Sequence, residues 1–395
     1  MILILSTAGD VSTSEVAEWL LYYNKEYTII NTDEAPVYSI NLFKNNVCLK
    51  VMGKSDLIDL SQVTSIWNRR LGFNPHEYAH SYLNRKAKSD FWDWNFQTKM
   101  LEYESKLLFD YIHYALDRNS LKALGDYSSN MVNKLVVLDI AKEFKIDIPE
   151  TYIINTKSCL LDLLQQAEAK EQNLISKPIG EIIYRNKKTK NEETFYSTYV
   201  EKVDKALVDA MPDTFFPSLF QVEIKKDYEL RIFYLCGEFY TMAIFSQEYK
   251  MARTDFRKYS GEKPLKCVPY SLPNEIKNKL KIMMDRLNLN TGSIDMIVDV
   301  EQKYYFLEVN PSGQFGMTSE PCNYYLEKKL LNICDLVMKK KIENNLKDIM
   351  PFYCNFLECS KIRIRKKVAC PQHYYKKAKV LVLDYIVTEL PTIYQ

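Results

Sequence analysis

The chain has 395 residues, of which 47% are hydrophobic and 26% are charged, and its formal net charge is +2. This length and composition are enough for a large core divided among two or three domains. The nearly balanced charge gives no indication of binding to nucleic acid, and no apolar run is long enough to span a bilayer.

The first 125 residues are predicted to form a domain with a parallel sheet. A strand at Ile2–Leu5 is followed by a polar turn and by a helix at Glu15–Leu21, for which Ser14 is the expected N-cap. The next strand, Tyr27–Asn31, completes a βαβ order, which is typical of parallel sheets. Further on, the sequence predicts a short strand and a long amphipathic helix, at Ser65–Arg70 and at residues 91–118.

Residues 126–205 are interpreted as a second unit. A helical period covers Asn133–Phe144, and apolar runs predict strands at Ile148–Asn155 and Leu174–Pro178. The lysine-rich stretch that follows, residues 184–193, is polar and is expected to be a mobile loop.

Residues 206–343 contain the densest set of predicted strands. Apolar runs predict these strands at Leu219–Ile224, Glu229–Leu235, Phe239–Ser246, Ile294–Val298 and Tyr304–Val309. Residues 344–395 carry a basic run and no clear periodicity.

The last two of these strands place oxygen-bearing side chains together. A polar turn joins them, so a hairpin would bring Asp295 close to Glu308 and Asn310. Glu308 and Asn310 are two residues apart and therefore share one face of their strand. Two carboxylates and an amide oxygen form a hard oxygen site suited to Mg²⁺ beside nucleotide phosphates. The alternative is a solvated face with scattered acids, although unpaired carboxylates in apolar sequence are costly to bury.

Four cations lie in positions suited to anion binding. Lys134 begins a helix, and Lys177 directly follows a buried-looking strand in Leu-Ile-Ser-Lys-Pro. A compact ammonium at such a place suits phosphate oxygens, although a solvated surface lysine is the alternative. Arg231 and Arg257 have apolar or aromatic neighbours, where a guanidinium usually has an anionic partner.

The order of these parts over residues 1–340 resembles the ATP-grasp superfamily. Three segments resemble its peptide-modifying branch, which contains the microviridin-type (graspetide) ligases: Ser-Thr-Ala-Gly-Asp-Val-Ser-Thr from Ser6, Ile-Trp-Asn-Arg-Arg from Ile66, and Phe-Leu-Glu-Val-Asn-Pro-Ser-Gly-Gln-Phe-Gly from Phe306. A further segment, Phe315–Lys329, looks most like the grasp-with-spasm maturases, whose systems include a radical SAM protein of the SPASM type.

The resemblance implies an α/β fold that is α+β in its catalytic half. Its expected parts are a pre-ATP-grasp domain with a parallel sheet (1–125), a central lid domain (126–205), a C-terminal domain with the metal site (206–343) and a tail of unknown role (344–395).

The resemblance also implies roles for individual residues. The nucleotide phosphates would contact Lys134 and Lys177, adenine would meet backbone groups of Gln221, Val222, Glu223 and Ile224, and ribose would bind Glu229. Mg²⁺ would be held by Asp295, Glu308 and Asn310, and the catalytic residues at the phosphates or the acyl-phosphate would be Arg231 and Arg257. Two departures weaken single assignments. Glu229 stands where Asp is usual, and Asn68 stands where an aromatic is common, which leaves Arg69 and Arg70 as substrate candidates only.

The expected protein is therefore an ATP-grasp ligase that uses ATP and Mg²⁺ and forms side-chain ester or amide crosslinks in a ribosomally made precursor peptide. One alternative is a ligase that joins amino acids to a small molecule or a protein terminus. Another is an inactive nucleotide- or peptide-binding protein. The expected partners are a precursor peptide with leader and core, a SPASM protein and a second copy of the chain in a homodimer. Scattered cysteines and the absence of a basic leader before the first strand favour the cytoplasm, with no membrane or nucleic-acid partner.

Overall fold

The computed structural model describes residues 1–32, 37–44, 46–50, 57–70, 74–76, 78–79, 94–119, 123–126, 132–180, 184–188, 193–197, 200–248 and 265–331. Backbone contacts group Met1–Lys340 into one compact unit and Lys341–Gln395 into another. The predicted tail lies in the second unit, outside the described residues.

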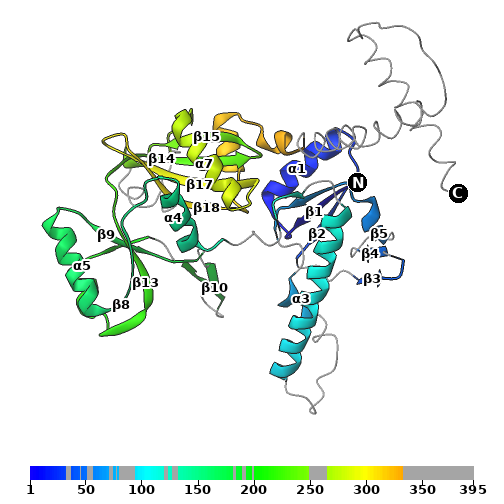
Figure 1. The fold of residues 1–395 in the computed structure, drawn as a ribbon, viewed down its shortest axis with the longest axis horizontal. Helices are drawn as coiled ribbons and strands as arrows, with labels where there is room; N and C mark the ends of the chain where they lie inside the picture. Colours follow the sequence, from blue (N-terminus) through cyan, green and yellow to red (C-terminus); the bar gives the residue numbers. More distant parts are fainter. Residues whose placement is uncertain are drawn as a thin grey trace, which may run out of the picture. The chain divides into compact units, whose positions relative to one another are not determined.

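The N-terminal part is built on a parallel sheet of four strands in the order β2-β1-β6-β7 (Figure 1). The strands are β1 (Ile2–Ser6), β2 (Tyr27–Asn31), β6 (Ser65–Asn68) and β7 (Ala123–Leu124), and the helices are α1 (Val11–Tyr22) and α3 (Trp94–Asn119). The central strand β1 is buried along its whole length. One apolar cluster joins Leu3 and Leu5 to Phe109 and Ile112 of α3, and another joins Ile2 and Ile4 to Val16 and Leu20 of α1. The predicted βαβ unit with its parallel sheet is confirmed.

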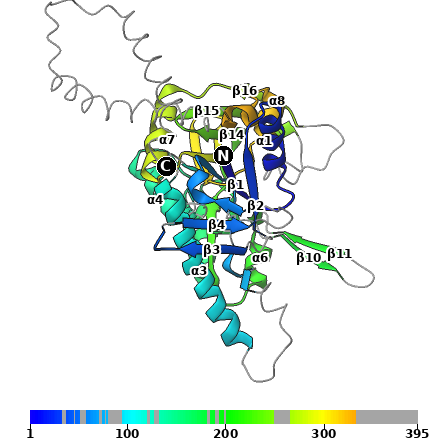
Figure 2. The same ribbon diagram turned by 90° about the vertical axis from the view of Figure 1, so that its right-hand side faces the viewer.

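Helix α1 begins earlier than the sequence suggested. The predicted N-cap, Ser14, is wrong, because Asp10 occupies that position and its side chain accepts a hydrogen bond from the Thr13 amide at 3.0 Å. A carboxylate that accepts from a first-turn amide starts the helix at Val11. A second, antiparallel sheet, β3-β4-β5, lies in the same part of the chain (Figure 2); its strands are Val37–Asn41, Asn46–Lys50 and Leu57–Asp59, and the 3-10 turn η1 follows at Leu60–Gln62.

The middle of the chain forms an antiparallel sheet in the order β12-β9-β13-β8. The elements are β8 (Thr151–Thr156), α5 (Lys157–Ala169), β9 (Leu174–Lys177), β12 (Glu201–Val203), α6 (Lys205–Ala210) and β13 (Thr214–Val222). Leu160 and Leu164 of α5 pack with Leu174 and Phe220 in the core of this unit.

The lysine-rich stretch after β9 differs from the prediction. Strands β10 (Tyr184–Lys188) and β11 (Glu193–Ser197) pair in an antiparallel hairpin, so the expected loop is wrong for these residues. The two strands pair in register, from Tyr184 with Ser197 to Lys188 with Glu193. This pairing gives the backbone of the polar stretch hydrogen bonds that it would not have in a loop. Residues 189–192, between the two strands in the sequence, lie outside the described residues.

The C-terminal sheet has five antiparallel strands in the order β16-β15-β14-β17-β18 (Figure 1). The strands are β14 (Lys226–Leu235), β15 (Glu238–Ile244), β16 (Cys267–Tyr270), β17 (Thr291–Asp299) and β18 (Tyr304–Asn310); the helical elements of this part are η2 (Ser246–Glu248), α7 (Asn274–Arg286) and α8 (Gly316–Cys322). Leu280, Met283 and Met284 of α7 pack on one face of the sheet. Helix α4 (Lys134–Glu143) packs into the same core, although its sequence precedes the middle sheet.

Together, the parallel N-terminal sheet and the antiparallel sheets confirm the predicted α/β class with an α+β catalytic half. No helix in the part of the chain that the structure describes is long and apolar enough to cross a membrane. The cysteines that it describes are free thiols: Cys48, Cys159, Cys236, Cys267 and Cys322.

Candidate active site

Asp295 and Glu308 lie directly opposite each other on the antiparallel strands β17 and β18. The same register places Asn310 opposite Ser293 at the end of β18. Glu308 and Asn310 are two residues apart and so share a strand face. The predicted hairpin therefore forms, and it brings the three oxygen-bearing residues to one region.

Each of the two carboxylates is paired with a cation from a neighbouring element. Arg231 is the register partner of Asp295 on β14, and its Nη1 donates to both Asp295 oxygens, at 2.8 and 2.6 Å. At the start of α4, Lys134 Nζ lies 2.9 Å from Glu308 Oε2. These pairs offset the repulsion between two carboxylates that stand side by side on a half-buried surface.

The third oxygen has a different environment. Asn310 Oδ1 is buried and has no hydrogen-bond partner among the described residues. A buried acceptor without a donor costs stability, so such an atom needs an explanation. Beside two carboxylates, it is a suitable ligand for a hard cation. The described residues contain no group of three His, Cys, Asp or Glu side chains arranged for a metal. The donor set that fits Mg²⁺ is accordingly two carboxylates and one amide.

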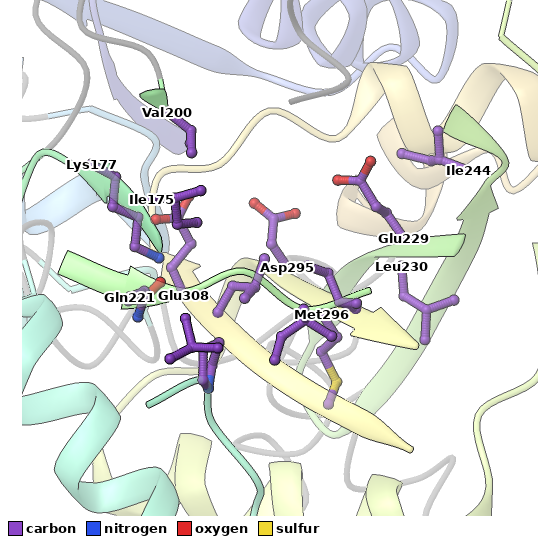
Figure 3. A pocket seen from close by; sticks show the side chains of 15 residues that line it. Ile175, Lys177, Val200, Gln221, Glu229, Leu230, Ile244, Asp295, Met296 and Glu308 are labelled. Carbon is purple, nitrogen blue, oxygen red and sulfur yellow. The ribbon is translucent and has the colours of Figure 1, made fainter. Parts of the chain in front are cut away.

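A cleft between the middle sheet and the C-terminal sheet contains most of the predicted nucleotide site (Figure 3). Its polar lining includes Lys177, Gln221, Glu229, Asp295 and Glu308. Figure 3 shows Asp295 between Glu308 on one side and Glu229 on the other, with Lys177 and Gln221 near Glu308. Residues far apart in the sequence thus form one polar surface of the cleft.

Sequence reasoning did not identify the apolar walls of this cleft, which include Pro149, Ile175, Val200, Met296 and Leu307. Ile175 and Lys177 are two apart on β9, so strand alternation could have placed Ile175 beside the lysine. The other apolar residues have no sequence signal that distinguishes them from core residues. Apolar walls with a few polar groups are typical of sites that bind small molecules and cofactors.

The strand predicted to meet adenine, at the end of β13, is partly engaged within the protein. The Val222 amide donates to the Glu150 carbonyl at 3.0 Å, and the Glu223 amide donates to the Asn173 carbonyl at 2.8 Å. The Glu223 side chain is also held, since Oε2 accepts from Asn173 Nδ2 at 2.8 Å and lies 3.1 Å from Lys202 Nζ.

Two groups of this segment remain oriented toward the cleft. Gln221 lines it while its Nε2 donates to Thr151 Oγ1 at 2.8 Å. Ile224 also lines the cleft, and no hydrogen bond from its amide is present in the described part of the chain. Ile224 therefore carries the predicted backbone contact with adenine better than Val222 or Glu223.

Glu229, predicted to bind ribose, is a buried carboxylate at the wall of the cleft. Its Oε1 accepts from Lys226 Nζ and from Ser246 Oγ, both at 2.7 Å. Burial raises the pKa of Glu229, while the Lys226 ammonium and the Ser246 hydroxyl act in the opposite direction. One oxygen is thus committed to internal contacts, and the ribose role stays a prediction for the other.

The two arginines predicted as substrate candidates have different environments. Arg69 is only 3% exposed. Its Nε and Nη2 donate to the two oxygens of Asp10, both at 3.0 Å, and its Nη1 donates to the Ser312 carbonyl. These contacts give Arg69 an internal role and do not support contact with a substrate. Arg70, whose side chain is 31% exposed, is the better candidate for that contact. Arg257 lies outside the described residues.

Comparison with known proteins shows no match to a protein-family model and no match by sequence to a curated protein. The fold, in contrast, is similar to several solved structures. A RiPP-associated ATP-grasp ligase of Chryseobacterium gregarium, in complex with ADP and a leader and core peptide, has a TM-score of 0.66 and 23% identity; the match covers 86% of this chain and 96% of that one.

Two further structures give the same result. The macrocyclase MdnC of Microcystis aeruginosa, bound with the precursor peptide MdnA, has a TM-score of 0.64 and 23% identity over 86% of this chain and 100% of that chain. The ATP-grasp ligase PsnB, complexed with minimal precursor, Mg and ADP, has a TM-score of 0.62 and 14% identity over 86% of this chain and 96% of that one. At these identities the likeness shows the fold: the chain has the ATP-grasp fold that the sequence analysis predicted.

Proposed function

We propose that this protein is an ATP-dependent ligase that joins a carboxylate to a hydroxyl or amine through an acyl-phosphate. Its substrate in this proposal is a ribosomally made precursor peptide with a leader and a core, in which it forms side-chain ester or amide crosslinks. The observation that carries the proposal is the cleft between two sheets, which gathers Lys177, Asp295 and Glu308 near the unpartnered oxygen of Asn310. All three solved ligases with the same fold are bound to a precursor peptide or part of one, and two of them also contain ADP, which supports this substrate class.

The chemistry explains why ATP is needed. A carboxylate is a poor electrophile because its oxygen is a poor leaving group. Transfer of the γ-phosphoryl group to a carboxylate oxygen forms an acyl-phosphate and releases ADP. A hydroxyl or amine then attacks the carbonyl carbon, phosphate leaves with the bonding electrons, and the nucleophile loses its proton. The peptide thereby loses one water for each crosslink.

The residues of the cleft would serve this reaction mainly by charge and position. Mg²⁺, held by Asp295, Glu308 and Asn310, would supply charge neutralisation at the phosphates. Lys177 and Lys134 would bind phosphate oxygens, and Arg231 and Arg257 would hold the phosphates or the acyl-phosphate. Ile224 and Gln221 would orient the nucleotide base between the apolar walls. Preorganised cations of this kind stabilise charge that develops in the transition state.

The two lysines are placed to link the parts of the cleft. Lys134 Nζ contacts Glu308 and also lies 3.3 Å from the Pro178 carbonyl and 3.5 Å from the Gly180 carbonyl. Lys134 thus connects the metal hairpin with the segment that follows Lys177. An anionic phosphate between the two ammonium groups would draw this segment and the hairpin toward each other.

Incubation with ATP, Mg²⁺ and candidate precursor peptides tests the proposal. Release of ADP together with loss of one water per crosslink, read by mass spectrometry, is the expected result. A mass gain of one amino acid on a small molecule or protein terminus would instead indicate the alternative ligase reaction. Nucleotide binding without ADP release, over a broad set of acidic and hydroxyl-rich peptides, would indicate an inactive binding protein.

The finer partner assignments are also proposals. Similarity of Phe315–Lys329 to the grasp-with-spasm maturases supports a radical SAM protein of the SPASM type in the same system, which co-purification with such a protein would test. Scattered free thiols support a cytoplasmic location. We also propose that the protein forms a homodimer. Light scattering of the purified protein would test this by measuring its mass in solution.

A further inference from the structure

A buried ion pair of the N-terminal domain, Asp10 with Arg69, contacts the turn that follows the predicted metal ligand Asn310. Asp10 caps α1, and Arg69 follows β6, so both belong to the parallel-sheet domain. Their bidentate pair has two contacts of 3.0 Å, and both residues are buried. The remaining guanidinium nitrogen, Nη1, donates to the carbonyl of Ser312 and lies 3.4 Å from that of Gly313.

The turn that Arg69 contacts begins at Asn310. The Gly313 amide donates to the Asn310 carbonyl at 3.0 Å, which closes a tight turn through Pro311 and Ser312. The turn is pressed against β17, because a Cβ at Gly313 would lie 2.3 Å from the Ser293 side chain. Ser293 Oγ in turn donates to the Gln314 carbonyl at 3.2 Å. The position of Asn310 therefore depends on contacts from two sides, β17 and Arg69.

An aromatic contact strengthens the same junction. Phe315 is 1% exposed and packs against Trp67 of β6 and Phe233 of β14, with ring centroids 6.4 and 5.2 Å apart. The chain segment from Asn310 to Phe315 is thus held at both of its ends. Two of its carbonyl groups, those of Ser312 and Gly313, accept from a guanidinium whose orientation Asp10 fixes.

We propose that Asp10 and Arg69 are positioning residues for the metal ligand Asn310, so that the N-terminal domain shapes the metal site of the catalytic domain. This inference rests on the proposed function for the identity of the metal and nucleotide. Arg69 acts through the turn and touches no reacting atom. Its planar group is suited to the task, since it can hold two carboxylate oxygens and a carbonyl at fixed angles, which a lysine ammonium does not do.

The test compares ADP binding with and without Mg²⁺ by calorimetry. Arg69→Lys keeps the positive charge beside Asp10 and should therefore fold, as circular dichroism would check. Loss of an outer contact that orients a metal ligand typically weakens metal binding by about tenfold or more, so the gain in ADP affinity on adding Mg²⁺ should fall by about that factor. ADP affinity in EDTA should stay within about twofold of the unchanged protein.

Three further variants separate positioning from general stability. Gly313→Ala displaces the turn from the β17 side and should cause the same selective loss. In an Asn310→Ala background, Arg69→Lys should cause no further Mg²⁺-dependent loss, because the two residues act in series. Lys106→Gln removes an exposed ion pair with Asp110 in the same domain and should change neither affinity.

Equal loss of ADP affinity with and without Mg²⁺, or additive effects with Asn310→Ala, would overturn the positioning role. Absence of any Mg²⁺ effect in the unchanged protein would count against the proposed function itself.

A different observation carries a second inference, which concerns helix α3. Its face opposite the core is apolar and exposed. The exposed fractions are Phe96 58%, Met100 55%, Tyr103 62%, Leu107 48% and Tyr114 59%. Four of these residues, from Phe96 to Leu107, follow spacings of four, three and four, which is the seam of a helix that packs along another helix. The seam from Phe96 to Tyr114 is about 27 Å long at 1.5 Å per residue.

Charges beside the seam indicate the partner. Lys99 lies along one flank in the first half of α3, and Asp117 lies along the same flank in the second half; between them, Lys106 and Asp110 pair with each other within the helix. When two such helices pack antiparallel, the lysine half of each faces the aspartate half of the other. We infer that a second copy of this chain docks antiparallel on the α3 seam, because a two-fold axis makes these charges complementary.

Light scattering across a range of concentrations tests this assembly. A dimer is expected for the unchanged protein, and Tyr103→Glu or Leu107→Glu should convert it to monomer, whereas Phe216→Glu, at an exposed position on β13, should not. Lys99→Asp should weaken the dimer, and adding Asp117→Lys should restore it. A monomer at all concentrations, a dimer that survives both glutamates, or failure of the charge exchange to restore it would overturn the inference.

Discussion

Asp295 and Glu308 face each other across the β17–β18 ladder, and each is held by a cation from a different element, Arg231 on β14 and Lys134 on α4. The two carboxylates are therefore close enough to share a cation. The fixed positive charges of Arg231 and Lys134 offset the repulsion between them. A divalent cation bound here would compete with Lys134 for Glu308. Nucleotide phosphates could then take up the ammonium that Glu308 releases.

The first prediction concerns the ligands themselves. Glu308→Gln and Asn310→Ala should each lower Mg²⁺-dependent turnover at least about a hundredfold, or roughly 2.7 kcal/mol, because a lost ligand removes charge neutralisation in the transition state. Steady-state ADP release measures this, with circular dichroism to confirm folding. Glu301→Gln, in the exposed turn of the same hairpin, is the matched control and should leave turnover unchanged. Near-normal turnover in a folded ligand variant would remove the metal assignment.

The second prediction concerns Lys177, which lines the cleft at the end of β9. Lys177→Ala should raise the ATP KM and lower kcat together, since the ammonium would serve both ground-state binding and charge development. Lys170→Ala, at an exposed position just after α5, controls for loss of a positive charge and should alter neither constant. A change confined to the peptide KM would place Lys177 on the substrate side of the cleft.

The features of the fold that could be predicted are those that depend on residues close together in the sequence. The hairpin with Asp295, Glu308 and Asn310 was predictable because strand period and a polar turn determine which side chains meet. Lys134 and Lys177 were expected at a helix start and a strand end, and the structure has them at these places.

Other features were decided by contacts that sequence does not display. Arg69 was a substrate candidate only through the family resemblance, and its buried partners, Asp10 and Ser312, could not be foreseen because they lie 59 and 243 residues away in the sequence. Ser14 was predicted as the helix cap because Asp10 lies in a polar run that offers several possible cap residues. The stretch 184–193 looked like a loop because its strands bear charges where most strands have apolar residues.

The third prediction concerns the hairpin β10–β11, which is proposed to close over bound nucleotide and shield the acyl-phosphate from water. Its first strand carries Arg185, Lys187 and Lys188, and Lys190 follows them in the sequence; these cations would meet anions on closure. Limited trypsin digestion should be slower at these sites with ATP and Mg²⁺ than without. Cleavage at Lys170, followed in the same digest, serves as the internal control. Unchanged cleavage under saturating nucleotide would leave the hairpin as ordinary surface.

The fourth prediction concerns the buried pair of Lys226 and Glu229, which are 8% and 9% exposed. Lys226→Met should lower the free energy of unfolding by roughly 3 kcal/mol, because it leaves a buried carboxylate without its cation. Lys225→Met, at the exposed neighbouring position, should change it by less than about 0.5 kcal/mol. Urea denaturation at neutral pH measures both. The double change Lys226→Met with Glu229→Leu should recover most of the loss, and a lack of recovery would show that the pair matters beyond its charges.

The last prediction concerns His113, which is buried on the core side of α3. Burial lowers the pKa of its imidazole from 6.5 to about 4, although Asp110 and Asp126 act in the opposite direction. The folded protein therefore binds this proton less readily than the unfolded chain. Its contribution to stability is complete above pH 6.5 and is lost as the pH falls toward 4. Between pH 7 and pH 5, this one group should reduce the free energy of unfolding by about 2 kcal/mol.

His113→Gln removes the titrating group and should flatten that part of the pH profile, even where it lowers stability at neutral pH. Urea denaturation at pH 7, 6 and 5 gives the pH profile of each of the two proteins. If the unchanged protein and His113→Gln lose the same stability over this range, the acid sensitivity belongs to other groups, because only a residue with different proton affinities in the folded and unfolded states can produce it.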